Sequence, residues 1–413
     1  MAQASGIANS NGGSSRPATV AIIGAGLTGL LTAHGLKKNG FDVIVYEREH
    51  SIDARPRDWT ILLHWALPIL AKLLPSELVD KLPEAICNPH LEFDEWAESL
   101  VCYHGETGQF LFKSNIPGSR RVSRQRLRKV LAEGLSIQWG KGLDRIDAGD
   151  YAMPCSVRLG FVDGDTVEAD YVLGTDGAKS KVRELLFNGG EAARVLYSGF
   201  MFATCISQFK DAAKVEAIVK LHPVTAMAMS TSAVWGFGVL YIDEPKDKTN
   251  WTTFWVKVWR GSQSSLPVEK SGPETLRYLK QTSKGLAEQF QCQIDEAPDE
   301  SNCYIDEMKY WVPQPYDNRS GRITLAGDAA HPMLVYRGQG FQHAIVDASN
   351  YLDALVKIRD GADRALVLSA YDVEIAERGA KAVKQSLEEA DLSMDPNMAD
   401  KMLMAREGHG RSA

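Results

Sequence analysis

The fold is decided by residues 19–47, TVAIIGAGLTGLLTAHGLKKNGFDVIVYE. A short apolar run stops at Gly24–Gly29, a turn rich in glycine, and apolar residues at helical spacing follow it. A second apolar run then ends at Glu47, 23 residues after Gly24. We therefore predict a strand, a tight turn, a helix and a second strand, which together open an α/β lobe with a parallel sheet.

The glycine turn has the Gly-x-Gly-x-x-Gly spacing of a dinucleotide-binding loop. Gly24 permits the tight turn, Gly26 lets a pyrophosphate approach the backbone, and Gly29 lets the helix pack closely on the strand. Leu27 and Thr28 begin the helix, whose free N–H groups would face the anion. We predict that all five residues contribute to cofactor binding.

Glu47 is placed to accept hydrogen bonds from the hydroxyls of an adenosine ribose. A carboxylate here would repel a 2′-phosphate, so the site favours FAD or NAD over NADP. A chance glycine pattern in a loop is the alternative interpretation. The flanking strands and the acid at the expected spacing favour a Rossmann-like dinucleotide site.

Two later segments share one form, a short apolar strand that runs into a small-residue turn with an aspartate. They are EADYVLGTDGAKSKVR, residues 168–183, and GRITLAGDAAHP, residues 321–332. With these three motifs in this order, the chain resembles the group A flavoprotein monooxygenases, the family of para-hydroxybenzoate hydroxylase and salicylate hydroxylase. The resemblance runs from about Ala18 to Tyr371 and is strongest to fungal members.

The resemblance implies bound FAD. Asp328 would hydrogen-bond a ribityl hydroxyl, and the turn at Asp176 would border the place where NADH or NADPH enters transiently. Gly338 and Gly340 would leave room at the start of a helix that includes Phe341, whose N-terminus would face the flavin pyrimidine edge and stabilise reduced flavin. No second glycine motif with a strand, helix and acid follows in the sequence, as in the family. The choice between NADH and NADPH stays open.

Two arginines match family positions beside the cofactor. Arg124 opens a predicted helix, and Arg57 falls where the family has a mobile-loop arginine, with Arg55 as a competing assignment. The alternative for residues 120–128 is a basic, solvated helix face. We expect the arginines of that segment other than Arg124 to lie at the surface.

The implied activity is that of a flavin-dependent monooxygenase. NAD(P)H would reduce FAD, O2 would add at the flavin C4a to give a hydroperoxide, and this would hydroxylate or epoxidise a small aromatic or polycyclic metabolite. One alternative is a dehydrogenase, oxidase or reductase of the same fold that does not oxygenate. Val335 stands where the family has a proline, which favours this alternative because a looser loop would raise uncoupling. A dinucleotide-fold binding protein without redox chemistry is a second alternative, and the intact aspartate motifs argue against it.

Arg194 and Tyr197 are the predicted catalytic side chains. Arg194 follows Asp176 by 18 residues, where some fungal relatives place an arginine that engages substrate or hydroperoxide. A surface arginine in the loop GGEAARVL is the alternative. His331 and His343 are expected to have packing or helix-terminal roles.

From about Tyr197 to Trp259 the pattern changes to period two, which indicates antiparallel strands that roof a pocket. One amphipathic helix is predicted over residues 271–290. The predicted strands are MFATCISQF (201–209), AIVKLH (217–222), VWGFGVLYI (234–242) and WTTFWVKVW (251–259).

The predicted fold class is therefore α/β, with a Rossmann-like FAD-binding lobe, a second lobe whose antiparallel sheet binds substrate, and C-terminal helices. Both lobes are discontinuous in sequence, and the chain is expected to fray from about Asp400. The FAD lobe comprises residues 17–92, 115–190 and 316–360, the substrate lobe 93–114 and 191–315, the helical segment 361–413, and a disordered leader 1–16.

Composition narrows the class further. A net charge of −7 and the lack of a basic tract argue against nucleic-acid binding. Six scattered cysteines without a Cys-x-x-Cys pair indicate free thiols in a reducing, cytoplasmic setting, and no disulfide framework or metal site. No apolar window is long enough to predict a membrane span. The expected partners are O2 and a small-molecule substrate, and the sequence does not indicate an oligomeric state.

Overall fold

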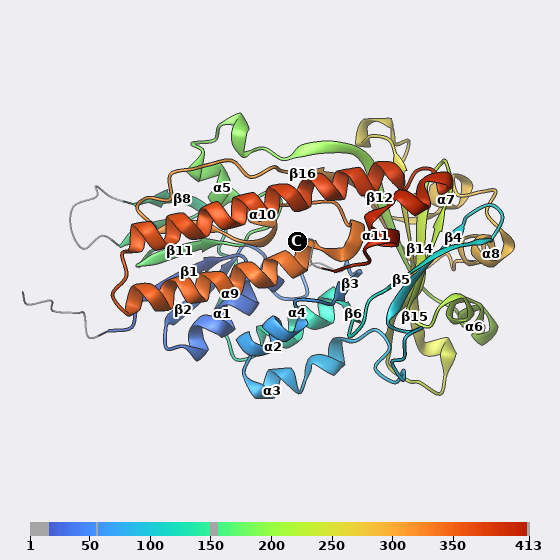
Figure 1. The fold of residues 1–413 in the computed structure, drawn as a ribbon, viewed down its shortest axis with the longest axis horizontal. Coiled ribbons are helices and arrows are strands. Elements are labelled where there is room, and N and C mark those ends of the chain that lie inside the picture. Colours follow the sequence, from blue (N-terminus) through green and yellow to red (C-terminus); the bar gives the residue numbers. More distant parts are fainter. Residues whose placement is uncertain (1–15, 55–56, 149–155, 411–413) are drawn as a thin grey trace, which may run out of the picture.

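The computed structural model describes residues 16–54, 57–148 and 156–410. Two lobes lie side by side, each built on its own sheet, and a long C-terminal helix, α10, reaches from one to the other (Figure 1). Among these described residues, no helix has the length and apolar character that a membrane span requires. Most of the predicted leader, together with Arg55 and Cys155, lies outside the described residues.

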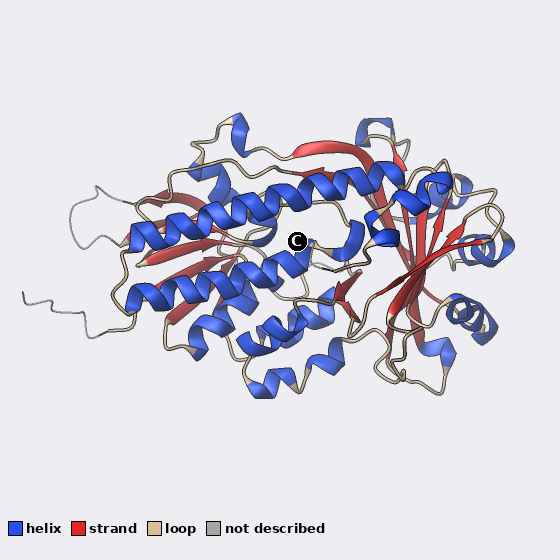
Figure 2. Cartoon of the chain, viewed as in Figure 1, coloured by secondary structure: helices blue, strands red, loops and turns tan. Residues whose placement is uncertain are grey.

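The helices are distributed over both lobes (Figure 2). They are α1 (Leu27–Lys38), α2 (Leu67–Leu73), α3 (Ser76–Val79), α4 (Arg124–Ala132), α5 (Lys181–Leu186), α6 (Ala212–Leu221), α7 (Pro273–Gln281), α8 (Glu288–Asp295), α9 (Gly340–Arg359), α10 (Arg364–Leu392) and α11 (Leu403–Arg406).

The first lobe holds a five-stranded sheet whose neighbouring strands all run parallel. The predicted strand–turn–helix–strand unit over residues 19–47 is confirmed as β1, α1 and β2. The order across the sheet is β17 (Ile323–Leu325), β11 (Tyr171–Gly174), β1 (Thr19–Ile23), β2 (Asp42–Glu47) and β7 (Ile137–Trp139).

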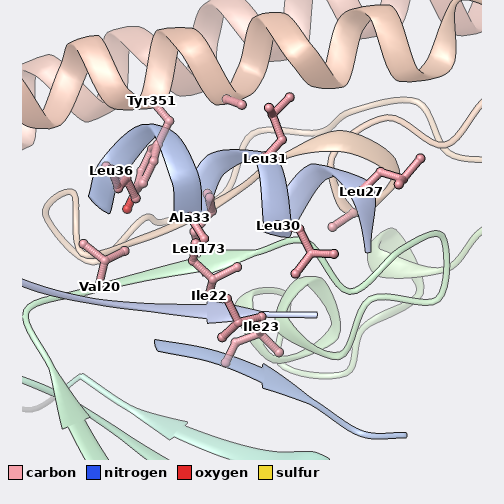
Figure 3. Packing of buried hydrophobic residues seen from close by; sticks show 14 of the residues in the cluster. Val20, Ile22, Ile23, Leu27, Leu30, Leu31, Ala33, Leu36, Leu173 and Tyr351 are labelled. Atoms are coloured by element: carbon pink, nitrogen blue, oxygen red, sulfur yellow. The ribbon is translucent and has the colours of Figure 1, made fainter. Parts of the chain in front are cut away.

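Helix α1 packs between this sheet and α9 (Figure 3). Leu30, Leu31 and Leu36 of the helix are fully buried, as is Ile22 of β1, and Tyr351 of α9 covers the other side. Burying each such leucine stabilises the fold by about 1.5–3 kcal/mol. Because both faces of α1 are covered, its first turn is held at a fixed place above the sheet.

The second lobe holds a mostly antiparallel, seven-stranded sheet, as predicted for the roof of a pocket. The described residues also form two smaller sheets, one of β8 (Leu143–Asp147), β9 (Val157–Phe161) and β10 (Thr166–Ala169), the other of β3 (Thr60–Leu63) and β6 (Arg120–Ser123). The large sheet runs in the order β16 (Asn302–Tyr310), β12 (Leu196–Gln208), β15 (Trp251–Arg260), β14 (Val234–Ile242), β13 (Thr225–Met229), β4 (Ser99–His104) and β5 (Phe110–Asn115).

Two predicted elements of this lobe are wrong. The expected strand 217–222 is the end of helix α6, whose first turn is capped by Asp211 and whose Val215 and Ile218 are buried three residues apart. The expected single helix over 271–290 is two helices, α7 and α8. The chain breaks between them at Gly285, which takes a φ of +86°.

The prediction that all cysteines are free thiols is also wrong. Cys205 and Cys303 form a disulfide, because they are directly opposed on the antiparallel strands β12 and β16 with Cα atoms 4.2 Å apart. Nearly 100 residues separate them in sequence, so only the strand register brings them together. Cys87, Cys102 and Cys292 are free.

The chain does not fray from Asp400 as predicted. After α10 it turns back through α11, and the carboxylate of Glu389 accepts hydrogen bonds from the backbone N–H groups of Leu403 and Met404. Met402 is fully buried. The last described residues consequently return to the region between the two lobes (Figure 1).

Candidate functional site

A cavity of about 550 Å3 lies where the two lobes meet. This volume is typical of small-molecule sites. One wall is the inner face of the large sheet, and the other carries most of the residues predicted to hold the cofactor. The predicted residues in that wall are Gly26, Leu27, Thr28, Arg57, Arg124, Asp328, Gly338, Gly340 and Phe341.

Each of the three glycines in the first turn is needed for a different structural reason. Gly24 has a φ of +108°, and a Cβ there would lie 2.7 Å from the carbonyl oxygen of Thr175. A Cβ on Gly29 would lie 2.5 Å from Thr175 Oγ1, so the helix could not pack as closely on the sheet. At Gly26 the nearest atom would be 3.9 Å away, which leaves open space beside the backbone on the cavity side.

The first turns of α1 and α9 both reach the cavity wall, and neither has a side-chain cap. The helices α4, α5 and α10, by contrast, are capped by Ser123, Ser180 and Asp363. Uncapped N–H groups at a helix N-terminus favour an anion or an electron-rich group. Two such termini on one cavity fit a ligand with a pyrophosphate at one end and an electron-accepting ring at the other.

Glu47 ties the glycine turn to the second strand. Its carboxylate accepts hydrogen bonds from the N–H groups of Ala25 at 2.8 Å and Glu49 at 3.1 Å, and retains capacity for a further donor. Arg128 lies 3.9 Å from Glu47 and donates to the carbonyls of Ala25 and Ile52. The expectation that Arg128 is a surface residue is wrong: it lies one helical turn after Arg124, on the face of α4 that meets the glycine turn.

Asp328 follows β17 and makes no hydrogen bond or salt bridge to any described residue. Its accessible surface faces the cavity, and enclosure raises the pKa of the carboxyl group, although His331, Arg124 and Arg183 oppose this rise. The carboxylate is open to the cavity space and has no donor from the described part of the protein. A ligand hydroxyl in this part of the cavity would supply the missing donor, so the residues present fit a ribityl chain.

The turn before α9 is held in an uncommon backbone conformation. Arg337 has a φ of +60° and Gly338 a φ of +59°, which places the chain against Leu62 of β3. Gln342 fixes the same contact, because it donates to the carbonyl of Leu62 at 2.6 Å and accepts from the N–H of His64 at 3.2 Å. The N-terminus of α9 is thereby locked at the cavity wall.

Arg57 and Arg124 both stack on aromatic rings at this wall. The Arg57 guanidinium lies 4.1 Å from the centre of the Tyr304 ring on β16, so it connects the two lobes across the cavity. The Arg124 guanidinium lies 4.6 Å from the centre of the Trp59 ring. Stacked guanidinium groups keep their charge while one face is shielded from water.

Asp176 stands next to the cavity but does not line it; its neighbour Gly177 does. The Asp176 carboxylate accepts from the Ser180 hydroxyl and from the N–H groups of Lys181 and Val182, at the start of α5. In this structure it supports the turn. A direct contact between Asp176 and a nicotinamide donor remains a prediction.

The two predicted catalytic residues are not in the cavity wall. The Arg194 side chain is 70% exposed and lies 3.7 Å from Glu191. Tyr197 sits near the start of β12, where its hydroxyl is buried without a partner and burial raises its pKa. Arg194 lies two residues before β12, and Tyr197 is the second residue of this strand, ahead of the cavity-lining residues Phe202 and Thr204. Their catalytic roles therefore stay predictions without geometric support.

A buried cluster that the sequence did not reveal fixes the loop of Asp328. Asp347 on α9 accepts from Gly327 N and pairs with His331 Nε2, both at 2.7 Å, while Arg378 on α10 binds its second oxygen at 2.7 Å. Burial alone would raise the pKa of Asp347, but His331 and Arg378 hold it well below its ordinary value. The packing role expected for His331 agrees with this arrangement.

His409, near the end of the described chain, also lines the cavity. Its ring lies 5.8 Å from that of His64 and is hydrogen-bonded at 3.0 Å to Ser114 on β5, while its carbonyl accepts from Gln339. Burial lowers its pKa well below the ordinary value, as it lowers that of His64 to about 4, so both rings are neutral at pH 7. The tail thus closes one side of the site.

Comparisons with known proteins bear on this architecture. A family described as an FAD binding domain matches residues 121–386, and one described as an NAD(P)-binding Rossmann-like domain matches residues 22–58. An FAD-dependent monooxygenase of Penicillium herquei is 32% identical over 381 residues, which cover 92% of this chain and 91% of the relative. One of Talaromyces islandicus is 33% identical over 369 residues, 89% of this chain and 90% of the relative.

Solved structures share the fold at lower identity. A salicylate hydroxylase in complex with its substrate superposes with a TM-score of 0.73 at 20% identity, covering 96% of this chain and 97% of that one. The 2,6-dihydroxypyridine-3-hydroxylase of Arthrobacter nicotinovorans gives a TM-score of 0.70 at 18% identity, covering 92% and 94%. At these identities the likeness concerns the fold.

Proposed function

This chain belongs to the group A FAD-dependent monooxygenases, and we propose that it inserts one oxygen atom into an apolar, ring-containing small molecule held between its two lobes. The observation that carries this proposal is the continuity of the cavity, which runs from the glycine turn at Gly26 to the large sheet. On the sheet side, β16 brings Asp306, Glu307 and Lys309 to the cavity. The strands that follow it across the sheet add an apolar and partly aromatic surface. It is formed by Phe202, Met227, Val234, Phe254, Val256 and Val258.

The cofactor would lie along the first-lobe wall. Gly26 and the first turn of α1 would hold the pyrophosphate, Asp328 would accept from the ribityl chain, and the N-terminus of α9 would face the pyrimidine edge of the ring. Arg57 and Arg124 would add positive charge along the same wall. Bound FAD supplies the redox chemistry, taking a hydride from reduced nicotinamide and delivering one oxygen atom of O2 to the substrate.

The protein itself contributes orientation, charge and exclusion of water. The turn at Arg337–Gly338 fixes the helix terminus that stabilises negative charge on a reduced ring. The apolar sheet face holds a ring system against that position, and the tail with His409 covers the side. The reaction balances as substrate C–H, O2, NAD(P)H and H+ giving C–OH, H2O and NAD(P)+.

The test is isotopic labelling with the purified, flavin-loaded enzyme. A panel of hydroxylated naphthalenes and anthrones is incubated with NADH or NADPH under 18O2, and products are analysed by mass spectrometry. We expect one product oxygen to come from 18O2 and none from labelled water. Substrate oxidation without label from O2 would refute the proposal and favour a dehydrogenase or oxidase of the same fold.

A further inference from the structure

Arg121 lies on β6, where the first lobe meets strands β4 and β13 of the large sheet. Its side chain lines the main cavity and also a small adjoining hollow beside β4 and β13. Leu62, Leu100 and Thr225 line both spaces as well. Arg121 therefore stands at the end of the cavity that borders the substrate lobe.

The guanidinium of Arg121 is poorly satisfied. Among the described residues its single hydrogen bond is from Nη1 to Thr60 Oγ1 at 2.6 Å, no carboxylate lies within ion-pair distance, and Nε is buried without a partner. The carboxylate of Asp58, on the neighbouring loop, accepts hydrogen bonds from the Ser123 hydroxyl and from the backbone N–H groups of Gln125 and Trp59.

Other buried arginines show what a satisfied site looks like in this protein. Arg183 donates to three backbone carbonyls, and Arg378 pairs with Asp347 and Glu374. Arg322 is also incompletely bonded, but it lines neither hollow. Arg337 also lines the main cavity, but its guanidinium donates to the carbonyls of Gly408 and Gly410. The guanidinium of Arg121, which also borders ligand space, has no backbone partner of this kind in the described part of the chain.

The surroundings of Arg121 do not neutralise it. Burial raises the pKa of the Cys87 thiol well above its ordinary value and lowers that of His222 to about 4, so both are uncharged at pH 7. His409 is neutral for the same reason, and the charge on Arg121 contributes to its low pKa. Burial lowers the pKa of Arg121 itself, but an arginine side chain stays protonated in proteins. An enclosed cation without a counter-charge is costly unless a ligand brings one.

We propose that Arg121 recognises an ionised oxygen group on the substrate, a carboxylate, phenolate or enolate attached to an apolar ring system. The free N–H groups of the guanidinium would bind this oxygen, and the Thr60 hydroxyl, which accepts from Arg121, can donate its own hydrogen to the same group. The apolar sheet face would hold the rings. This inference rests on the proposed function for the identity of the site, but the anion preference is a property of binding and does not require turnover.

The test compares matched ligands on the flavin-loaded enzyme. Dissociation constants for 2-naphthoate and neutral 2-naphthamide, and for a naphthol above and below its own pKa, are measured from the change in flavin absorbance and in tryptophan fluorescence. Wild type should bind the anions about 10- to 100-fold more tightly than their neutral counterparts. R121M should lose this preference while binding the amide within about threefold of wild type. R121K should recover part of the preference for anions. R126Q, which alters an exposed arginine on α4 paired with Asp243, is the matched control and should behave as wild type.

A second measurement needs no ligand. Because R121M removes an unpaired, enclosed charge and keeps a similar length, the ligand-free variant should unfold at the same or a higher temperature than wild type. The assignment of Arg121 would be overturned if R121M unfolded at a lower temperature than wild type or lost affinity for the anion and the amide equally. It would also be overturned if wild type showed no preference for anions, or if R121M lost FAD affinity with unchanged ligand selectivity. Failure of oxygen labelling with an intact anion preference would instead refute only the proposed reaction.

Discussion

Replacing Gly26 with alanine should separate cofactor binding from folding. The backbone at Gly26 is extended, with a φ of −80° and a ψ of 176°, which alanine adopts freely. The added methyl group would meet nothing closer than 3.9 Å in the protein, yet it would project into the cavity beside the first turn of α1. The cofactor-free enzyme should therefore unfold within about 0.5 kcal/mol of wild type, or gain up to about 1 kcal/mol from a less flexible unfolded chain.

FAD affinity should fall in the same variant. The methyl group displaces the pyrophosphate from the N–H groups of α1, and each charge-assisted hydrogen bond is worth about 1.5–3 kcal/mol, so a loss of roughly 10- to 100-fold is expected. At an FAD concentration 100 times the wild-type dissociation constant, bound FAD stabilises wild type by about 2.7 kcal/mol, and this gain should shrink to about 1 kcal/mol after a 30-fold loss.

Gly29→Ala is the contrasting variant. A methyl group there would lie 2.5 Å from Thr175 Oγ1 and even closer to the Gly24 carbonyl, so α1 must move away from the sheet. Overpacking of this kind costs about 1–3 kcal/mol or more, and it should destabilise the cofactor-free protein as well. The assays are FAD titration by fluorescence and thermal unfolding with and without FAD. Unchanged FAD affinity in G26A would show that the pyrophosphate does not lie against Gly26. Destabilisation of cofactor-free G26A equal to that of G29A would show that the space beside Gly26 is needed for folding.

Three further predictions concern stability, coupling and the tail. Burial raises the pKa of Asp372, which is hydrogen-bonded to Tyr316, to about 7, above its value in the unfolded chain. The folded protein therefore holds this proton more tightly, and wild type should lose stability as pH rises from about 4 to about 7. In denaturant titrations across that range, D372N should lack this loss of stability. Val335→Pro suits the observed φ of −68° and should stabilise by about 0.4–1 kcal/mol and lower the peroxide released per NAD(P)H consumed; a peroxide yield equal to wild type would count against a loosened loop. His409→Ala leaves the Ser114 hydroxyl without its partner and opens the cavity, so it should cost about 1–3 kcal/mol in thermal unfolding and raise peroxide release; unchanged values would show that the tail does not seal the site.

The first lobe could be predicted from patterns that are local in the sequence. The strand, glycine turn and helix of residues 19–47 depend on contacts close in sequence, such as the approach of Gly29 to Gly24, and periodicity identifies them. Strand β14 likewise coincides with the predicted strand 234–242. The apolar run 217–222 was wrongly predicted as a strand because it is too short for its pattern to distinguish a strand from a helix. The cap at Asp211 and the spacing of Val215 were the signals that favoured a helix.

The site was less accessible to sequence reasoning because its remaining parts come from distant segments. Arg121 differs from the half-exposed Arg126 because strands β4 and β13 lie beside it, and no local pattern shows this contact. His409 reaches the cavity only because α10 carries the chain across both lobes before it turns back. Asp347 could have been suspected, since it lies two helical turns after Gly340 on the helix predicted to face the cofactor.

The most direct test of the account is a crystal structure of the flavin-loaded enzyme. FAD density should run from Gly26–Thr28, past Asp328, to the N-terminus of α9, with the ring facing the sheet at Phe254 and Val256. A flavin ring outside the cavity, or a pyrophosphate that does not contact the first turn of α1, would contradict the account.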